Sequence, residues 1–445
     1  MFRLIFLFAF SILGFMACAP LGVTVGSQVQ DGQSNPVATI RPPTSSEVLI
    51  LWNGDGQETQ SIAVIDAATG GLRTRLPYGV LNRDQSLLYA ATSTGDGTAT
   101  TVRVLDIPSG KVLRSATLEG SFELTGETAL SPDERLLVLS RQFSLADRGE
   151  YERTPAGEST FAVLETSLDQ EPRIISLPGS FEVDALYARG DSLYLIEHLQ
   201  PADSGNYQVR VYDLDKGKLL PEVLGDGLKQ VVSTMSGTSL QQVISSDGRW
   251  AYSLYLNQEH GPFIHALNMA ERWSYCIFLP DVEKDDLSRQ LFWSIALSSD
   301  GQRLYAANGA LGILREYDLA EVLNSTGSLQ WIDRLIQEET GQLTEQTANG
   351  QGIPHNGISL SPDDRFLYIL GGRGICLVEA ETLQLMGYFP MDREVRDIAV
   401  SRDGNLLYAT TSDTSRDILV VDANTGKIIR TLREEKMHHS VRLGN

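Results

Sequence analysis

Three of the six histidines, His198, His260 and His355, lie in polar segments longer than a turn requires. Imidazole is a frequent ligand of zinc and a frequent general base. No His-x-x-x-His or Cys-x-x-Cys spacing links these histidines, so they do not form a recognisable metal-ligand set. We therefore expect no metal, no cofactor and no catalytic residue, and we interpret the histidines as part of a binding surface.

The same segments contain other side chains suited to binding. "RQFSLADRGEYERTPAGEST" spans residues 141–160, and "IPHNG" places an asparagine beside His355. Arginine and tyrosine are enriched in binding surfaces, and long loops are where binding residues concentrate. The predicted partner-binding residues are Arg148, Tyr151, Arg153, His198, His260, His355 and Asn356.

A short turn that joins two strands recurs along the chain. "SPDERLLVL" begins at Ser131 and "SPDDRFLYI" begins at Ser361, and shorter or varied copies lie between and around them. A catalytic motif is needed once, whereas a unit of architecture is repeated. Aspartate in such a turn bonds the turn's own backbone amides, so we predict a structural role for it. The seven turn aspartates are Asp84, Asp133, Asp191, Asp247, Asp300, Asp363 and Asp403.

A second signature, of the form "VIDAATGGLRTRL" or "VVDANTGKIIRTL", follows each turn and joins two further strands. It has eight copies, the first of which precedes any Ser-x-Asp turn. Four short strands in a period of roughly 40 to 60 residues are typical of a β-propeller. The acidic or amide residues that end the first strand of each copy are Asp66, Asp106, Glu165, Asp213, Asn268, Asp318, Glu379 and Asp422.

The unequal counts of the two signatures predict how the ring closes. Residues 47–76 supply three strands of a blade but lack the innermost one, and "HHSVRLGN" remains at the C-terminus. We predict an all-β propeller of eight four-stranded blades, in which Ser440–Leu443 completes the first blade. The alternative is seven blades, if the unit near Ala320–Leu335 is an insertion.

Strand alternation divides the loops between two faces of the predicted ring. The Ser-x-Asp turns and most Thr-Gly turns share one face and are short. The loops between second and third strands and between blades share the other, and every long polar segment belongs to it. We therefore expect the partner on the long-loop face.

These repeats resemble those of the YVTN family of bacterial surface propellers, whose units carry "SPDG…LYV…VIDxxTGKV", and the resemblance extends from residue 47 onward. This resemblance implies the propeller fold and a binding or display role, since fold alone does not specify function. "DAATGGL" and "DANTGKI" also resemble repeats of quinoprotein dehydrogenases. Their motif ends in a tryptophan that docks neighbouring blades, and here Thr74 and Arg430 occupy that region.

One enzyme family offers an alternative function. "IPHNGISLSPDDRFLYI" resembles a segment of gluconolactonase-type propellers, which implies that Asn356 is a metal ligand in the central channel. Those enzymes carry an acidic ligand just past the following strand, where this chain has Gly371 and Gly372. This difference argues against a metal site here. The resemblance nevertheless gives a metal-dependent lactonase as the alternative function.

The N-terminus is typical of an export signal. Arg3 precedes an apolar run, Leu4–Met16, which is too short to span a membrane. "FMAC" resembles the bacterial lipobox, which implies a signal peptide over residues 1–17 and lipidation of Cys18. Residues 18–46 then form a flexible linker before a propeller domain at 47–445. We expect an envelope lipoprotein attached to the membrane through this lipid alone; simple secretion is the alternative.

The net charge limits the class of partner, and the cysteine positions indicate the state of the thiols. Lys and Arg number 36 against 57 Asp and Glu, giving a net charge of -21, which disfavours nucleic acid as a partner. Cys276 and Cys376 each lie in an apolar run, so we expect two buried free thiols. The sequence thus favours a monomeric binding or scaffolding module for a protein or glycan over an enzyme.

Overall fold

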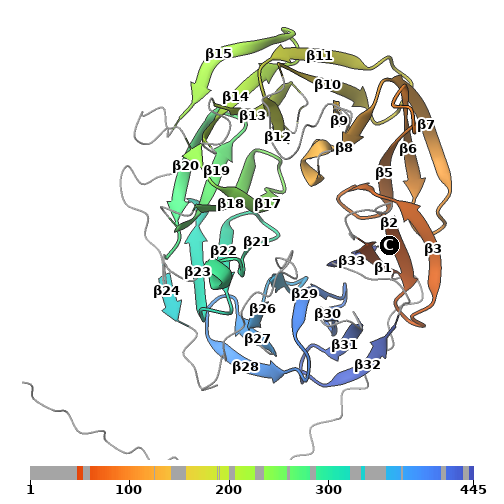
Figure 1. Ribbon diagram of the computed structural model, residues 1–445. Coiled ribbons are helices and arrows are strands. Elements are labelled where there is room, and N and C mark those ends of the chain that lie inside the picture. Colours follow the sequence, from red (N-terminus) through yellow and green to blue (C-terminus); the bar gives the residue numbers. More distant parts are fainter. Residues whose placement is uncertain are drawn as a thin grey trace, which may run out of the picture. The chain divides into compact units, whose positions relative to one another are not determined.

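The computed structural model describes residues 48–53, 61–124, 126–141, 157–187, 189, 191–199, 206–225, 235–257, 261–280, 287–320, 332–335, 357–371, 374–411, 417–433 and 440–444. All of them belong to the compact unit Pro42–Asn445. They form antiparallel sheets, arranged as an eight-bladed β-propeller (Figure 1). The all-β, eight-bladed prediction is confirmed.

Each blade runs from an inner strand to an outer one. In blades 1 to 4 the strands are β33 (Ser440–Gly444), β1 (Val48–Asn53), β2 (Ser61–Asp66), β3 (Leu72–Pro77); β4 (Gly79–Leu81), β5 (Leu87–Ser93), β6 (Ala99–Asp106), β7 (Val112–Glu119); β8 (Phe122–Leu124), β9 (Leu136–Arg141), β10 (Glu158–Glu165), β11 (Arg173–Pro178); β12 (Phe181–Leu186), β13 (Ser192–His198), β14 (Asn206–Asp213), β15 (Lys218–Leu224). In blades 5 to 8 they are β17 (Thr238–Ile244), β18 (Trp250–Asn257), β19 (Gly261–Asn268), β20 (Trp273–Phe278); β21 (Trp293–Leu297), β22 (Arg303–Asn308), β23 (Ile313–Asp318), β24 (Ile332–Leu335); β25 (Ile358–Leu360), β26 (Phe366–Gly371), β27 (Gly374–Glu379), β28 (Leu385–Pro390); β29 (Val395–Val400), β30 (Leu406–Thr411), β31 (Ile418–Asp422), β32 (Ile428–Leu432). A short β16 (Met235–Ser236) also pairs with β14.

The ring closes in blade 1, which takes strands from both ends of the chain. β33 pairs antiparallel with β1, from Val48 opposite Gly444 to Trp52 opposite Ser440. The predicted closure by the C-terminal segment is confirmed. The seven-blade alternative is excluded, because β24 pairs with β23 as the outer strand of blade 6 rather than forming an insertion.

The period-two pattern of the strands explains why the blades stack. In β2, Ile62 and Val64 pack with blade 2, whereas Ala63 and Ile65 pack with blade 8. Successive side chains of a strand point to opposite sheet faces, so each apolar strand fills two interfaces at once. Comparable buried clusters join the other neighbouring blades, which makes the core a continuous ring.

Departures from the regular pattern are few within the described ranges. A 3-10 helix, η1 (Glu127–Ala129), follows the inner strand of blade 3 and packs against β4, β9 and β12. The short helix α1 (Leu287–Gln290) precedes blade 6, and neither helix is long and apolar enough to cross a bilayer. Cys276 and Cys376 are free thiols, as predicted, but half-buried rather than buried.

The strand order gives the ring two faces. The "turn face" carries the turns between the first and second strands and between the third and fourth strands of each blade, counted outward. The "loop face" carries the remaining connections. Residues 142–157, 199–205 and 336–357 join strand ends that lie on the loop face, as the sequence predicts.

Candidate functional site

The Ser-x-Asp turns of the turn face are closed by their own side chains. In blade 5, Ser245 Oγ donates to Asp247 Oδ1 over 2.6 Å, and Asp247 Oδ1 accepts the backbone N–H of Arg249 at 3.0 Å. Ser245 Oγ also accepts the backbone N–H of Trp250 at 2.9 Å. The same three hydrogen bonds occur in the turns that begin at Ser131, Ser298, Ser361 and Ser401.

The electrostatics of these turns follow from the same contacts. The hydrogen bond from Ser298 holds the pKa of Asp300 below its ordinary value, and the bond from Ser361 does the same for Asp363. A carboxylate that accepts several donors is stabilised in its charged form. The turns are thus internally satisfied.

Two copies of the turn depart from the pattern. In blade 2, Asn82 replaces the serine, and its Oδ1 accepts the backbone N–H groups of Ser86 and Leu87 at 2.9 and 2.8 Å. Asp84 accepts the hydroxyl of Ser86 at 2.5 Å, and this bond lowers its pKa. In the shortened copy of blade 4, Asp191 Oδ1 is buried without a hydrogen-bond partner among the described residues.

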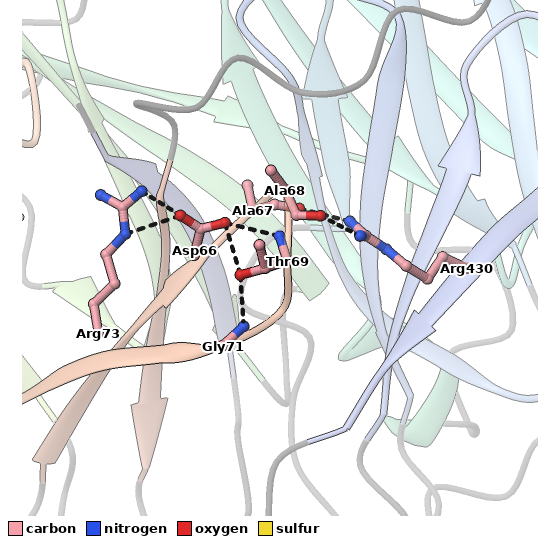
Figure 2. Close-up of polar contacts among 7 residues, drawn as sticks. All are labelled: Asp66, Ala67, Ala68, Thr69, Gly71, Arg73 and Arg430. Atoms are coloured by element: carbon pink, nitrogen blue, oxygen red, sulfur yellow. Dashed lines mark hydrogen bonds and ion pairs between the residues drawn. The ribbon is translucent and has the colours of Figure 1, made fainter.

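The turns between third and fourth strands are built around the acidic residue of the second signature. In blade 1, Asp66 Oδ1 accepts the backbone N–H and the hydroxyl of Thr69 at 2.8 and 2.9 Å, and Arg73 binds its other oxygen (Figure 2). These contacts, the one with Arg73 foremost, lower the pKa of Asp66 to about 2. Gly70 completes the turn at φ 76°, where glycine is favoured.

Side chains of one blade bind the third-to-fourth-strand turn of the next. Arg430, on β32 of blade 8, donates to the carbonyl oxygens of Ala67 and Ala68 in blade 1 (Figure 2). Arg173 of blade 3 donates in the same way to Leu214 of blade 4. Arg430 and Arg173 therefore each dock one blade onto the next.

The tyrosine of the Leu-Tyr pair makes related contacts. Tyr194 Oη donates to the carbonyl of Met269 in the next blade at 2.5 Å. Tyr368 Oη does so to Ala423 at 3.4 Å. Each acceptor directly follows the acidic or amide residue of its own turn, so two repeated signatures in neighbouring blades recognise one another.

Contacts between Ser-x-Asp turns reach across the ring on the turn face. Arg83 Nη1 of blade 2 donates to the carbonyl of Ser246 in blade 5 at 2.9 Å. Arg402 Nη2 of blade 8 donates to the carbonyl of Asp84 at 3.3 Å. The backbone N–H of Arg83 also donates to Glu134 Oε1 of blade 3 at 2.8 Å. Arginine side chains at the position before the turn aspartate thus cross the channel mouth.

A cavity of about 400 Å³ lies at this mouth. Its walls come from the inner strands and turns of blades 2, 3 and 5, and it is lined by Arg83, Gln85, Glu134 and Gln242 among others. Ligand pockets of proteins start at roughly 300 Å³, so a small molecule fits this space. We regard the cavity as the candidate functional site.

A buried polar cluster of blades 4 and 5 lies behind the cavity and is linked to it by Gln242. Gln242 Nε2 donates to Ser253 Oγ at 2.8 Å and lies 3.3 Å from Asp184 Oδ1. Asp184 is the extra residue of a β-bulge in β12. Burial, and next the charge of Glu182, raise its pKa to about 7. His265, whose Cα is the register partner of Ser253, is buried too, and burial lowers its pKa to about 4.

This cluster and the cavity differ in what they can do chemically. Asp184 and His265 could exchange protons near neutral or mildly acidic pH, but neither lines the cavity. A general acid or base must reach the reacting atom to within a hydrogen bond. The described lining offers a guanidinium, a carboxylate and amides, which can recognise a ligand. It suits binding.

Only one predicted partner-binding residue lies within the described ranges. His198 ends β13 at the loop face, with its Nε2 3.3 Å from Glu182 Oε2. The others fall outside those ranges: Arg148, Tyr151, Arg153, His260, His355 and Asn356. Among described residues, no cluster of three or more His, Cys, Asp or Glu side chains could hold a metal ion.

Sequence reasoning missed the residues of the cavity and of the buried cluster. Arg83 and Arg402 occupy the variable position of a repeated turn, so the departure from Ser or Pro at that position is the one signal that could have singled them out. Asp184 stands between Val183 and Ala185 in an inner strand, where a carboxyl is unusual. Nothing in the sequence indicates that these positions meet.

Comparison with known proteins supports the fold and goes no further. No family model matches the sequence, and no curated protein matches it. Similar solved structures include apo AztD from Citrobacter koseri, at TM-score 0.50 and 14% identity over 89% of this chain and 97% of that chain. Dihydro-heme d1 dehydrogenase NirN in complex with DHE has TM-score 0.53 and 15% identity over 93% and 77%. At such identities the likeness shows the propeller fold alone, and membership of the YVTN family stays a prediction.

A lactonase is among the similar structures as well. The periplasmic gluconolactonase PpgL of Pseudomonas aeruginosa has TM-score 0.43 and 18% identity, over 81% of this chain and 99% of that chain. Similarity at this level does not favour one function over another.

Proposed function

We propose that this propeller is an exported binding module that holds a protein or glycan partner on its loop face. In this proposal a lipid on Cys18 attaches it to the membrane of the cell envelope. The net charge of -21 fits a partner other than nucleic acid.

The difference in connection length between the turn face and the loop face is the observation that supports the proposal. On the turn face, most connections are as short as residues 82–86 or 423–427, and their polar side chains bond their own backbone or a neighbouring turn. The exceptions are residues 125–135, between β8 and β9, and residues 319–331, between β23 and β24. The loop face has the connections 142–157, 279–292 and 336–357. Binding residues concentrate in such long connections on a rigid scaffold.

Described side chains support a rigid rim on the loop face. Asp417, just before β31, is buried, and its Oδ2 lies 2.5 Å from Arg393 Nη1. Arg433, after β32, lies 3.6 Å from the other oxygen of Asp417. One buried carboxylate thus ties three segments of blade 8 together. A partner that binds a preorganised rim loses less conformational entropy on binding.

Photo-crosslinking in intact cells tests the proposed surface. A photoreactive side chain replaces Glu158, which is exposed at the loop-face start of β10 next to residues 142–157. We expect a discrete protein or glycan adduct from this position. The matched control replaces Asn424, which is exposed in the turn 423–427 of the turn face and uses only its backbone N–H in a hydrogen bond. Adducts from Asn424 and none from Glu158 would contradict the proposal.

The rival lactonase predicts a different result. The purified protein would open sugar lactones, and EDTA would abolish that activity. We expect no EDTA-sensitive opening of glucono-1,5-lactone above the uncatalysed rate. Lactone turnover that a divalent metal restores would replace the binding proposal with the enzyme.

Attachment through Cys18 is tested separately. Cells grown with labelled palmitate should label the wild-type protein and leave a Cys18→Ala variant unlabelled. Label retained by the variant would contradict lipidation at Cys18. It would not bear on the proposed binding surface of the loop face.

A further inference from the structure

The cavity at the channel mouth has apolar walls. Val80 and Leu81 of the inner strand of blade 2 line one side, Leu130 and Pro132 of blade 3 a second, and Val243 of blade 5 a third. Small-molecule sites are mostly apolar, with a few polar groups that fix the ligand's orientation. These walls therefore favour a ligand with an apolar body.

Two opposite charges line the same cavity without pairing. Arg83 forms no ion pair with any described carboxylate, and its side chain uses Nη1 on the carbonyl of Ser246. A guanidinium has five N–H donors, so others are left for a ligand. Glu134 likewise forms no ion pair in the described part of the chain, and it accepts hydrogen bonds from the Arg83 backbone and from Asn82 Nδ2. A carboxylate has about four acceptor sites.

Amide groups complete the lining. Gln85 Oε1 is buried and has no hydrogen-bond partner among the described residues. Leaving such a group unsatisfied costs free energy, which a ligand donor would recover. Gln242 directs its Nε2 to Ser253 and Asp184, away from the cavity that it lines.

We propose that this cavity binds a small zwitterion with an apolar side chain, of the class of amino acids and dipeptides. Arg83 binds the ligand's carboxylate, Glu134 binds its ammonium group, and the apolar walls hold its side chain. Guanidinium–carboxylate contacts are charge-assisted and can be bidentate. A volume of about 400 Å³ admits a molecule of this size but no folded partner. The site is independent of the proposed loop-face surface.

Titration calorimetry on the full-length protein with the dipeptide Leu-Leu tests the assignment. We expect saturable binding that Arg83→Gln and Glu134→Gln each weaken by roughly tenfold or more, because each removes a charge-assisted contact. N-acetyl-Leu-Leu lacks the ammonium group and Leu-Leu-amide lacks the carboxylate, while both keep the two side chains, so both should bind at least tenfold more weakly than Leu-Leu. Arg365→Gln is the matched control, because Arg365 is exposed in the blade 7 turn of the same face and does not line the cavity.

Each result of these experiments either supports or contradicts the proposed zwitterion site. Thermal melting of each variant shows whether it is folded, and the two ligand analogues test the same contacts on the unmodified protein. No saturable Leu-Leu binding would overturn the proposal, and so would binding that the Arg83 and Glu134 variants leave unchanged. N-acetyl-Leu-Leu binding as tightly as Leu-Leu would overturn the zwitterion in favour of a simple carboxylate.

Discussion

Arg430 Nη2 lies 2.6 Å from the carbonyl oxygen of Ala67, and this hydrogen bond joins the last blade of the ring to the first (Figure 2). The same pair of blades is joined near the channel, where β33 completes blade 1 and packs beside β29 and β30. The junction between the chain ends is therefore held at its inner strand and near its outer edge.

Replacing Arg430 should weaken this junction. Arg430→Met keeps the length of the side chain but leaves the carbonyls of Ala67 and Ala68 without their donor. Hydrogen bonds from charged groups contribute about 1.5–3 kcal/mol, so we expect a loss of that order in the free energy of unfolding. Urea unfolding measures it. The control Lys427→Met, at an exposed turn position, should change stability by less than about 0.5 kcal/mol. Equal losses in both variants would refute the docking role.

Replacing Gly309 by a larger residue should lower stability, because blades 6 and 7 pack closely at this position. A Cβ at Gly309 in blade 6 would lie 1.6 Å from the carbonyl oxygen of Leu370 in blade 7. Gly309→Ala should therefore cost roughly 1–3 kcal/mol or more, as overpacking does. Gly95→Ala is the matched control, since a Cβ there meets nothing within 4 Å. Thermal melting compares the two variants, and similar melting temperatures would show that the blades can separate at no cost.

Asp184 should make stability depend on pH. Its pKa is about 7 in the folded protein against an ordinary 3.8, so the folded state holds a proton that the unfolded chain releases. Its contribution is fully present below about pH 4, is lost as pH rises through 7, and is constant above that. We expect Asp184→Asn to remove this slope, which amounts to a few kcal/mol in order of magnitude.

The pH test is a series of urea unfolding curves between pH 4 and 8. The stability of wild type relative to Asp184→Asn should fall as pH rises. Asp96→Asn is the control: Asp96 is exposed and its pKa is about 2, so its difference from wild type should not change over this range. A flat difference for Asp184→Asn would mean that the carboxyl is ionised throughout.

Removal of the closing strand should open the ring. A chain that ends before Ser440 leaves β1 without its inner neighbour. An unpaired strand edge promotes association between chains. We expect loss of cooperative melting or aggregation in size-exclusion chromatography, whereas a chain lacking only Asn445 should behave as wild type. A monomeric truncation that melts normally would show that blade 1 holds with three strands.

The sequence allowed the fold to be predicted because its information is local and repeated. Each Ser-x-Asp turn and each strand ending in Asp66 or its equivalents identifies one hairpin, and the imbalance of the two signatures identified the closing strand. The candidate cavity was not predictable in this way. Arg83 and Ser246 meet only because blades 2 and 5 face each other across a ring, and no spacing in the chain encodes that meeting.

The buried cluster was missed for a related reason. Asp184 sits in a β-bulge, which shifts the register of β12 by one residue. Strict alternation of apolar and polar residues cannot reveal such a shift, because one extra residue changes which side chains face inward.

The closing strand also sets the order in which the molecule can be made. Blades 2 to 8 each consist of strands that are consecutive in the chain, so they can form as the chain is synthesised, from the N-terminal side onward. Blade 1 cannot, because among the described strands β1 comes first in the chain and its partner β33 comes last. Contacts of such long sequence separation form slowly. A growing chain therefore keeps one exposed strand edge until β33 has been synthesised, and the ring can close only after that.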